Sequence, residues 1–354
     1  MPEQKSITFS GLACPLPITN YPTVLLAHGG GGKLSQQLIQ NMFLSQFRNE
    51  FLEPLHDGAV FPIGATRLAF STDSYVVNPI FFPGGDIGEL AINGTVNDLA
   101  MCGAKPLYLS AAFIIEEGLP MEDLWRVILS MQAAAAKSGV MVVTGDTKVV
   151  DRGKGDRIFI NPAGVGEIAA GVAIGPKLAR PGDNIIINGP IAVHGIAIMS
   201  VREGLQFETQ IQSDTAALNG LVQSMLQSGD GVHVLRDPTR GGVASTLNEI
   251  AESAHVGIAI EEERLPLTEE VRGACEILGF DPLYVANEGK LIAFVAQGDT
   301  DRVLETMRDH PLGRDSVVIG RVVNDHPGVV IMKSRIGGSR VVDMLSGEQL
   351  PRIC

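Results

Sequence analysis

The chain has 354 residues, about the length of two ordinary domains, and 45% of them are hydrophobic, which is enough for a substantial core. It carries 27 Lys and Arg residues against 40 Asp and Glu residues, for a formal net charge of −13. Because so acidic a surface repels nucleic-acid backbones and anionic lipids, we expect neither nucleic acid nor membrane as a partner. Glycine is frequent, with 41 residues or about 12% against the usual ~7%, which predicts many tight turns.

Apolar strand-like runs alternate with helical windows along the chain, a pattern typical of an α/β protein. In the first half we expect strands at 67–72, 107–115 and 140–144, and helices at 87–101 and 121–138. A turn cluster at 179–183 predicts a domain boundary near residue 180. In the second half we expect strands at 184–188, 232–235, 257–262 and 291–296, and helices at 194–202, 215–227, 242–255, 268–278 and 300–309.

The four cysteines are too far apart in the sequence for a CxxC zinc site or a recognisable disulfide framework: Cys14, Cys102, Cys275 and Cys354. No apolar run reaches the ~18 residues of a membrane span. Residues 1–25 form a proline-punctuated extension without the charged start of a signal peptide. We therefore expect a cytoplasmic protein with reduced thiols.

The first candidate motif is a glycine run between two basic residues: His28, Gly29, Gly30, Gly31, Gly32 and Lys33. Consecutive glycines let main-chain N–H groups come close to phosphate oxygens, and the lysine would supply an opposing charge. The run is not a Walker A loop, because Leu34 stands where that motif has a magnesium-binding hydroxyl. Taken alone, the same run is equally typical of a flexible linker.

The second set of candidates consists of polar residues beside small ones, near the ends of expected elements: Asp57, Asp73, Asn97, Asp98, Asp146, Thr147, Lys148, Asp237 and Arg240. We expect Asp73 and Asp146 to follow strands directly, where a carboxylate faces the crevice that binds ligands in α/β folds. Mg²⁺ prefers oxygen ligands and commonly bridges nucleotide phosphates. A single aspartate after a strand is most often a turn or capping residue, but five in comparable settings favour a metal site.

Two further residues carry reactive groups. Glu288 directly precedes an apolar strand, and a partly buried carboxylate there could act as a general base, although a solvated loop carboxylate is the commoner outcome. Cys354 is the last residue, and a prenylation box would need the cysteine fourth from the end. A thiol on a short arm could serve as a covalent carrier and nucleophile, and a frayed tail without function is the alternative.

The segment TVNDLAMCGAKP at 95–106 resembles the signature of the aminoimidazole ribonucleotide synthetase superfamily. Within that superfamily the chain is most similar to the carbamoyl dehydratase family of hydrogenase maturation proteins. The similarity lies in the segments 26–28, 71–75, 82–85, 143–148, 240–242, 287–290 and 351–354. It covers nearly everything after residue 25, and the terminal cysteine separates this family from its relatives. Val193 departs from the family pattern, because similar proteins usually carry Asp there.

The resemblance implies a two-domain α/β fold of the aminoimidazole ribonucleotide synthetase type. An N-terminal domain over 26–180 would bind ATP and pair with a second copy, so that the strands of both form a dimeric β-barrel. A C-terminal α/β sandwich would cover 181–345, and a mobile tail would cover 346–354. A homodimer with ATP near its interface is therefore expected.

The resemblance also implies a reaction on the protein's own tail. A carbamoyltransferase partner would place a carbamoyl group on Cys354, and this protein would use ATP and Mg²⁺ to dehydrate the thiocarbamate to a thiocyanate. Phosphorylation turns the amide oxygen into a good leaving group, and a base removes the nitrogen protons. The cyano group would then pass to iron on a scaffold complex and become a ligand of a nickel–iron hydrogenase.

The resemblance assigns roles by position. The catalytic residues would be Cys354 as acceptor, Glu288 as base, and Lys148 and Arg240 as groups that neutralise the transferred phosphoryl. The ATP-binding residues would be His28, Gly29, Gly30, Gly31, Gly32, Lys33, Asp73, Asn97, Asp98, Asp146 and Thr147. Magnesium would be held by Asp57, Asp73, Asp98, Asp146 and Asp237.

Two other functions fit parts of the sequence. The protein could be a passive thiol carrier or scaffold whose aspartates are caps and turns. It could also be a selenophosphate synthetase or another small-molecule ATP-dependent enzyme of the same superfamily. Against the second function, Cys14 lies in a proline-rich stretch and is not followed directly by a glycine loop.

Overall fold

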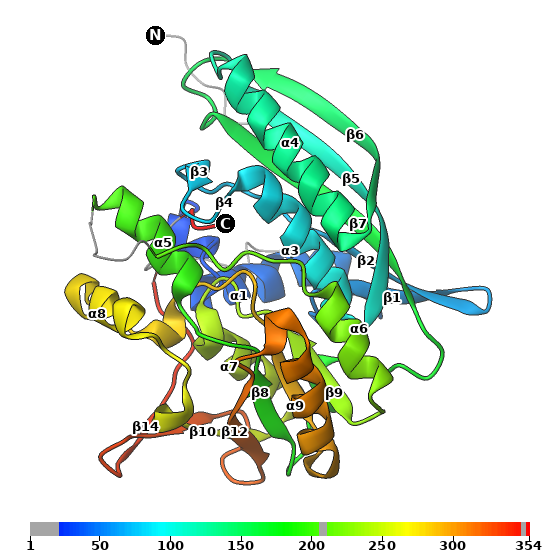
Figure 1. The fold of residues 1–354 in the computed structure, drawn as a ribbon, viewed down its shortest axis with the longest axis vertical. Coiled ribbons are helices and arrows are strands. Elements are labelled where there is room, and N and C mark those ends of the chain that lie inside the picture. The colour runs from blue at the N-terminus through cyan, green and yellow to red at the C-terminus, as the bar shows by residue number, and fades with distance from the viewer. Residues whose placement is uncertain (1–20, 205–210, 348–351) are drawn as a thin grey trace.

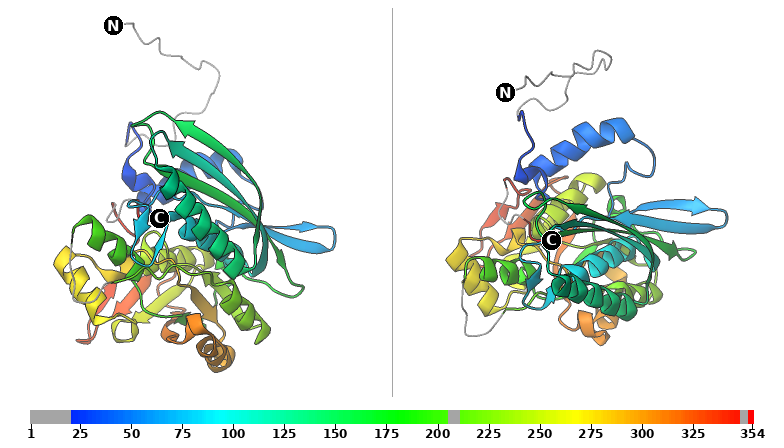
Figure 2. Two further views of the ribbon diagram at one scale, coloured as in Figure 1. Left: turned by 45° about the horizontal axis from the view of Figure 1, so that its top comes forward. Right: turned by 90° about the horizontal axis from the view of Figure 1, so that it is seen from above.

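The computed structural model describes residues 21–204, 211–347 and 352–354. Its two main sheets come from different halves of the chain, and helices cover them (Figures 1 and 2). This arrangement confirms the α/β class. No helix in the described ranges is long and apolar enough to cross a membrane.

The first sheet has the strand order β1-β2-β7-β5-β6. The bounds are β1 (Ala59–Ile63), β2 (Thr66–Thr72), β5 (Ala104–Glu116), β6 (Met141–Val150) and β7 (Ile158–Ile168). A separate small pair is formed by β3 (Phe81–Phe82) and β4 (Gly85–Asp86). Strand β5 pairs with β6 in parallel and with β7 antiparallel.

Helices α3 (Ile87–Met101) and α4 (Met121–Ser138) lie on one face of this sheet (Figure 1). The carboxylate of Asp86 caps α3 by accepting hydrogen bonds from the main-chain N–H groups of Gly88 and Glu89. Helix α3 is almost wholly buried, because α4 covers it on one side and the sheet on the other. The sequence predicted the bounds of both helices correctly.

The first sheet is open, with β1 and β6 at its edges, so the described residues of one chain do not close a barrel. Edge strand β6 is exposed along nearly its whole length, and its apolar side chains are exposed too, with Val143 at 58% and Val149 at 67%. Exposed apolar edges are rare in proteins that act as monomers, because they invite pairing with another chain. The exposed edge is consistent with pairing to a second copy, and the dimeric barrel stays a prediction because the structure contains one chain.

The second sheet has the order β14-β13-β10-β12-β8-β11-β9. Its strands are β8 (Asn184–Ile187), β9 (Val232–Arg236), β10 (Gly257–Glu261), β11 (Ile292–Val295), β12 (Val317–Val323), β13 (Val330–Lys333) and β14 (Ser339–Val341). Successive side chains of a strand point to opposite faces. Accordingly Ile185 and Ile187 join one core, whereas Ile186 joins another.

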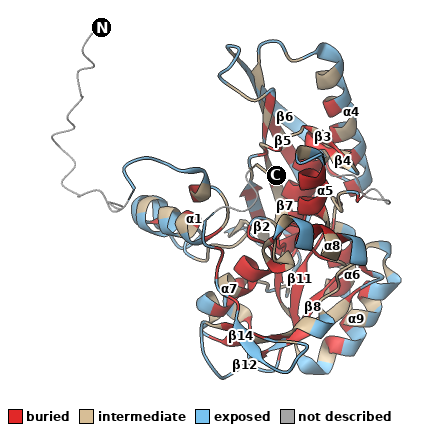
Figure 3. Cartoon of the chain, turned by 90° about the vertical axis from the view of Figure 1, so that its left-hand side faces the viewer, coloured by how far each residue is buried: buried red, intermediate tan, exposed pale blue. Residues whose placement is uncertain are grey.

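Helices cover both faces of the second sheet. Helices α5 (Val193–Arg202), α7 (Gly242–Ala254) and α8 (Glu269–Leu278) contribute to the core that contains Ile185. Helices α6 (Asn219–Gln227) and α9 (Thr300–Asp309) contribute to the core that contains Ile186. Figure 3 shows how buried residues concentrate along the sheets and the inner helix faces, while α1 (Lys33–Leu38) stands apart from the body.

Several sequence predictions differ from the structure. Strand β6 runs to Val150 and does not end at residue 144, so Asp146 lies inside the strand rather than after it. Seven strands were not predicted: β1, β3, β4, β7, β12, β13 and β14. In β7, glycines interrupt the apolar pattern. The structure explains one of these glycines, since a Cβ on Gly164 would lie 2.5 Å from the side chain of Leu109.

Candidate active site

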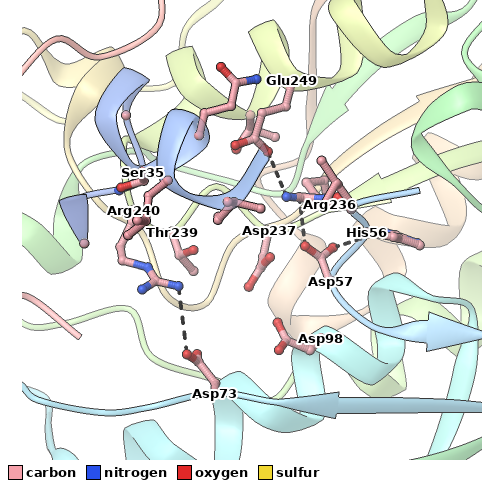
Figure 4. A pocket seen from close by; sticks show the side chains of 18 of the residues that line it. Ser35, His56, Asp57, Asp73, Asp98, Arg236, Asp237, Thr239, Arg240 and Glu249 are labelled. Atoms are coloured by element: carbon pink, nitrogen blue, oxygen red, sulfur yellow. Dashed lines mark hydrogen bonds and ion pairs between the residues drawn. The ribbon is translucent and has the colours of Figure 1, made fainter. Parts of the chain in front are cut away.

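A cavity of about 670 Å³ opens between α1, the first sheet and the start of α7 (Figure 4). It gathers charged and reactive side chains from distant parts of the sequence: Asp57, Asp73, Asp98, Arg236, Asp237, Arg240, Glu288 and Cys354. Asp73 follows β2, Asp98 lies on α3 and Asp237 follows β9. The two halves of the chain thus form this site together.

Three of these carboxylates could hold a metal ion. One oxygen from each of Asp57, Asp98 and Asp237 lies within 4.8 Å of the others. Oδ2 of Asp57 is buried and has no hydrogen-bond partner among the described residues. Hard oxygen ligands converging on one point fit Mg²⁺, so the residues present suit the predicted ion.

The electrostatics of the cluster point the same way. Burial raises the pKa of Asp98 well above its usual range, and the nearby Asp237 and Asp73 raise it further. Burial also raises the pKa of Asp57, although Arg236 opposes the shift. The pKa of Asp237 rises to about 6 for the same main reason. Burial is the main cause of these shifts and repulsion between the carboxylates adds to it, and a cation between them would relieve both effects.

Arg236 is a site residue that sequence reasoning missed. Its Nε lies 2.8 Å from Oδ1 of Asp57, and its Nη2 lies 2.7 Å from Oε2 of Glu249. It therefore fixes the orientation of Asp57 towards the cluster (Figure 4). Its place as the last residue of β9, directly before Asp237, was the available signal.

The glycine run lies against the other side of the cavity. Gly31 has a φ of 72°, and a Cβ there would lie 2.7 Å from the Cβ of Arg240. A Cβ on Gly32 would lie 2.4 Å from the main-chain oxygen of Leu345. Glycine is thus required because the loop packs tightly against two other segments, a reason that the sequence did not reveal.

The residues of this run are not equivalent. Four of them line the main cavity, namely His28, Gly29, Gly31 and Gly32, and Gly30 lines a smaller neighbouring one. Lys33 is exposed at the start of α1 and lines neither cavity. The predicted role of Lys33 as a phosphate counter-charge therefore does not fit its position in the single chain.

Arg240 connects the two cavities. Its Nη2 lies 3.9 Å from Oδ1 of Asp73, and it lines both the main cavity and the smaller one. It is followed by Gly241 and Gly242, both with positive φ, and a Cβ on Gly242 would lie 2.5 Å from the main-chain oxygen of Leu283. This tight turn starts α7 and presents the guanidinium group to the cavity.

The end of the chain is docked inside the molecule. The N–H of Val76 donates to the main-chain oxygen of Cys354 at 3.0 Å, and that of Asn78 donates to the oxygen of Arg352 at 3.3 Å. Nε2 of His194 lies 2.8 Å from the oxygen of Ile353. These contacts place Cys354 in the wall of both cavities.

Glu288 and Cys354 both face the main cavity. Glu288 is only 2% exposed, and burial, together with Asp237 and Asp73, raises the pKa of its carboxyl group well above the usual range. Burial also raises the pKa of the Cys354 thiol, against the opposing charge of Arg240. A carboxylate with a raised pKa accepts protons readily, as a general base must.

Besides Lys33, four predicted site residues lie outside the cavity. The amide of Asn97 donates to the main-chain oxygens of Ala216 and Glu288 and accepts from the N–H of Leu218, so it joins the two halves of the chain and does not line the cavity. The other three lie on the exposed strand β6, outside the cavity: Asp146, Thr147 and Lys148. Nζ of Lys148 contacts the Asp146 carboxylate at 2.8 Å. Their predicted ATP and metal roles cannot be fulfilled within one chain.

Comparisons with known families and structures agree with this geometry. Residues 55–168 match the model of the AIR synthase related protein N-terminal domain, and residues 180–333 match that of the C-terminal domain. Among solved structures, one of a HypE–HypF complex superposes with a TM-score of 0.83 at 48% identity, covering 87% of this chain and 99% of that one. A structure of HypE in complex with ATP superposes with a TM-score of 0.79 at 49% identity, covering 94% and 100%.

Curated sequences agree as well. The carbamoyl dehydratase HypE of Cupriavidus necator is 55% identical over 331 residues, which cover 93% of this chain and 94% of the relative. The carbamoyl dehydratase HypE of Escherichia coli K12 is 46% identical over 336 residues, covering 94% and 99%. Identity at this level, over nearly the full length of both chains, shows the family. The chain belongs to the HypE family, the carbamoyl dehydratase enzymes of hydrogenase maturation.

Proposed function

We propose that the protein uses ATP to dehydrate a carbamoyl group on its own Cys354 to a thiocyanate. The observation that carries this proposal is that the Cys354 residue, the Glu288 carboxylate and the acidic cluster line one cavity. A passive thiol carrier would need no such cluster beside its thiol. The reaction balances: the carbamoyl oxygen leaves as phosphate, both hydrogens leave the nitrogen as protons, and ATP becomes ADP.

The chain's own residues would divide this work. His28, Gly29, Gly31 and Gly32 would bind the phosphates of ATP, as the existence of a relative's complex with ATP supports. Arg240 would stabilise the negative charge that develops during phosphoryl transfer. Glu288 would accept a proton from the carbamoyl nitrogen, because its buried carboxylate lies in the same cavity as Cys354.

Asp57, Asp98 and Asp237 would hold Mg²⁺. Bound there, the ion would neutralise charge on the nucleotide phosphates. Asp73 lines the same cavity and would bind the nucleotide or a second ion.

We further propose that two proteins act on the tail in turn. A HypF-type carbamoyltransferase would load Cys354, since a solved HypE–HypF complex resembles this chain over 87% of its length. An iron-carrying scaffold complex would accept the cyano group. The free thiols of Cys102, Cys275 and Cys354 support a reducing compartment, the cytoplasm.

The proposed homodimer would account for the residues that lie outside the cavity. Pairing of two first sheets through the exposed β6 would bury Val143 and Val149. It would also bring Asp146 and Lys148 of one copy towards the site of the other, which is the remaining way for them to reach ATP.

The test is to follow the mass of carbamoylated protein. Full-length protein is S-carbamoylated at Cys354 with cyanate, and ATP with Mg²⁺ is added. We expect the C-terminal peptide to lose one water, and the loss to require both ATP and Mg²⁺. Unchanged mass would overturn the dehydratase proposal. Absence of thermal stabilisation by ATP with Mg²⁺ would favour the carrier instead.

A further inference from the structure

The hydroxyl of Tyr75 is buried and has no hydrogen-bond partner among the described residues. Tyr75 is 1% exposed, and its Oη makes no hydrogen bond with any described residue. Its backbone is held in place by an exchange of hydrogen bonds with Ile160 of β7, at 2.8 and 3.2 Å. Burying a hydroxyl without a partner destabilises a fold, whereas phenylalanine would fill the same space without that cost.

The neighbouring helix leaves room for this hydroxyl. Gly94 lies in the middle of α3, where glycine is unfavourable. A Cβ at this position would lie 1.9 Å from Oη of Tyr75 and 3.0 Å from its Cζ. The tightest contact is thus with the oxygen and not with the ring. Two unfavourable features, a buried hydroxyl without a partner and a glycine inside a helix, therefore accompany this one hydroxyl group.

Tyr75 also shares a cavity with the reacting groups. Tyr75, Gly94, Glu288 and Cys354 line the same cavity. The residue after Tyr75 holds the tail, because the N–H of Val76 donates to the main-chain oxygen of Cys354 at 3.0 Å. Oε1 of Glu288 is likewise buried without a hydrogen-bond partner in the described part of the chain. Two unpartnered polar atoms therefore share the cavity with the docked tail residue.

We propose that Tyr75 binds the carbamoyl group carried on Cys354 and, with Glu288, fixes the orientation of its amide nitrogen. A primary amide nitrogen offers two N–H donors. The carboxylate of Glu288 accepts one of them and the hydroxyl oxygen of Tyr75 accepts the other, so both orphaned atoms gain a partner when the carbamoylated tail is docked. The proton that leaves first is the one that faces Glu288. This inference rests on the proposed function.

The two-acceptor arrangement also defines the substrate class. It fits a primary amide, whose nitrogen has two hydrogens to offer, and it disfavours an N-alkylated carbamoyl group, which has one. A methylcarbamoyl group on Cys354 would leave one of the two buried acceptors unpartnered, which is costly.

The experiment uses Tyr75→Phe in the full-length protein, with Tyr108→Phe as the matched control on the exposed side of β5. Both proteins and the wild type are S-carbamoylated with cyanate, and the single-turnover loss of water on adding ATP and Mg²⁺ is followed by mass spectrometry. We expect the rate for Tyr75→Phe to fall about tenfold, the size of one lost hydrogen bond, and that for Tyr108→Phe to stay unchanged. ATP binding and the melting temperature should not fall, because the variant loses only an unpartnered hydroxyl.

A structural role would give a different result. If the rate of Tyr75→Phe equals that of the wild type, the inference is wrong, and a lower melting temperature in that case would assign the hydroxyl a structural role. If the wild type itself does not lose water, the proposed function has failed, and this outcome is distinct from the first.

A second variant tests the same hydroxyl from the other side. Gly94→Ala places a methyl group against Oη of Tyr75, so we expect it to slow the loss of water in the wild-type background. In the Tyr75→Phe background the same change should slow it by a much smaller factor. Equal losses in both backgrounds would overturn the inference.

Discussion

Nε2 of His194 lies 2.8 Å from the main-chain oxygen of Ile353, while Nδ1 of the same ring lies 2.7 Å from Oγ of Ser213. A carbonyl oxygen can only accept, so Nε2 must carry the hydrogen and donate it. Nδ1 then accepts from the Ser213 hydroxyl. Burial lowers the pKa of His194, which agrees with this neutral form. The ring therefore fastens the tail to α5.

Replacing His194 by leucine should loosen the tail. The variant loses both hydrogen bonds of the ring, of which the one to Ile353 holds the tail. That bond is worth about 1 kcal/mol, so the fraction of open tail should rise about fivefold. We expect the alkylation rate of Cys354 by iodoacetamide, followed by peptide mass mapping, to rise by the same factor. His233→Leu, which removes a comparable contact with Asp183, serves as the control and should leave the rate unchanged. An unchanged rate in His194→Leu would contradict the tail-holding role.

Replacing Asp237 by asparagine should change how stability depends on pH. Its folded pKa of about 6 lies above the ordinary ~4, so the folded state binds the proton more tightly than the unfolded state does. Asp237 therefore supports stability at low pH, and this support is lost as the pH rises through about 6. In EDTA, Asp237→Asn should be more stable than the wild type by up to about 3 kcal/mol at pH 8 and by about half as much at pH 5, and the two should be nearly equal at about pH 3.

With Mg²⁺ in place of EDTA, the wild type should become more stable than Asp237→Asn at pH 8. The ion should raise the melting temperature of the wild type at pH 8 and raise that of Asp237→Asn much less. Asp281→Asn, at a surface ion pair with Arg340, is the control and should respond to Mg²⁺ as the wild type does. An equal response of all three proteins would show that Asp237 does not bind the ion.

Replacing Arg240 by lysine should slow the reaction more than it weakens nucleotide binding. Lysine keeps the charge but loses the planar fork that faces the cavity. We expect the single-turnover rate of water loss to fall about 100-fold and the affinity for ATP to fall only a few-fold. Arg264→Lys, on the surface beside Glu261, should change neither quantity. A pure loss of affinity would assign Arg240 to ground-state binding alone.

Introducing a charge on β6 should separate the two copies of the proposed homodimer. Val143 is 58% exposed on this edge strand, and Val143→Asp would place a carboxylate in the paired interface. Sedimentation should then show a monomer. Monomeric wild-type protein at the same concentration would contradict the homodimer.

If Asp146 acts in the site of the other copy, two inactive variants should restore each other. Asp146→Asn keeps its own Cys354, and Cys354→Ala keeps its own Asp146. We expect little water loss from Asp146→Asn alone, none from Cys354→Ala alone, and partial recovery after the two are mixed and allowed to exchange. No recovery, in dimers shown to exchange, would mean that Asp146 has no role across the interface.

The sequence predicted best the elements whose own residues specify them. Helix α4 has a strong apolar periodicity and ends before Gly139 in a left-handed conformation, so both bounds were readable. The sequence did not predict that Asp146 lies inside strand β6 and not after it. Whether β6 stops at residue 144 or continues depends on its pairing with β5 as far as Val150, which is a property of the folded sheet. The part played by Arg236 depends likewise on Asp57, which lies 179 positions earlier in the chain.

The docked tail contains a bend with an energetic consequence. Arg352 has a φ of 55°, a left-handed conformation that costs a residue with a side chain about 1 kcal/mol or more. This bend turns Ile353 and Cys354 inward, and it relaxes when the tail leaves. The free energy of docking the tail is therefore the difference between the hydrogen bonds of the last three residues, which favour the docked state, and the backbone strain at Arg352, which opposes it. If the tail visits a partner, then the cavity, then a second partner, as proposed above, the strain at Arg352 would make its release easier.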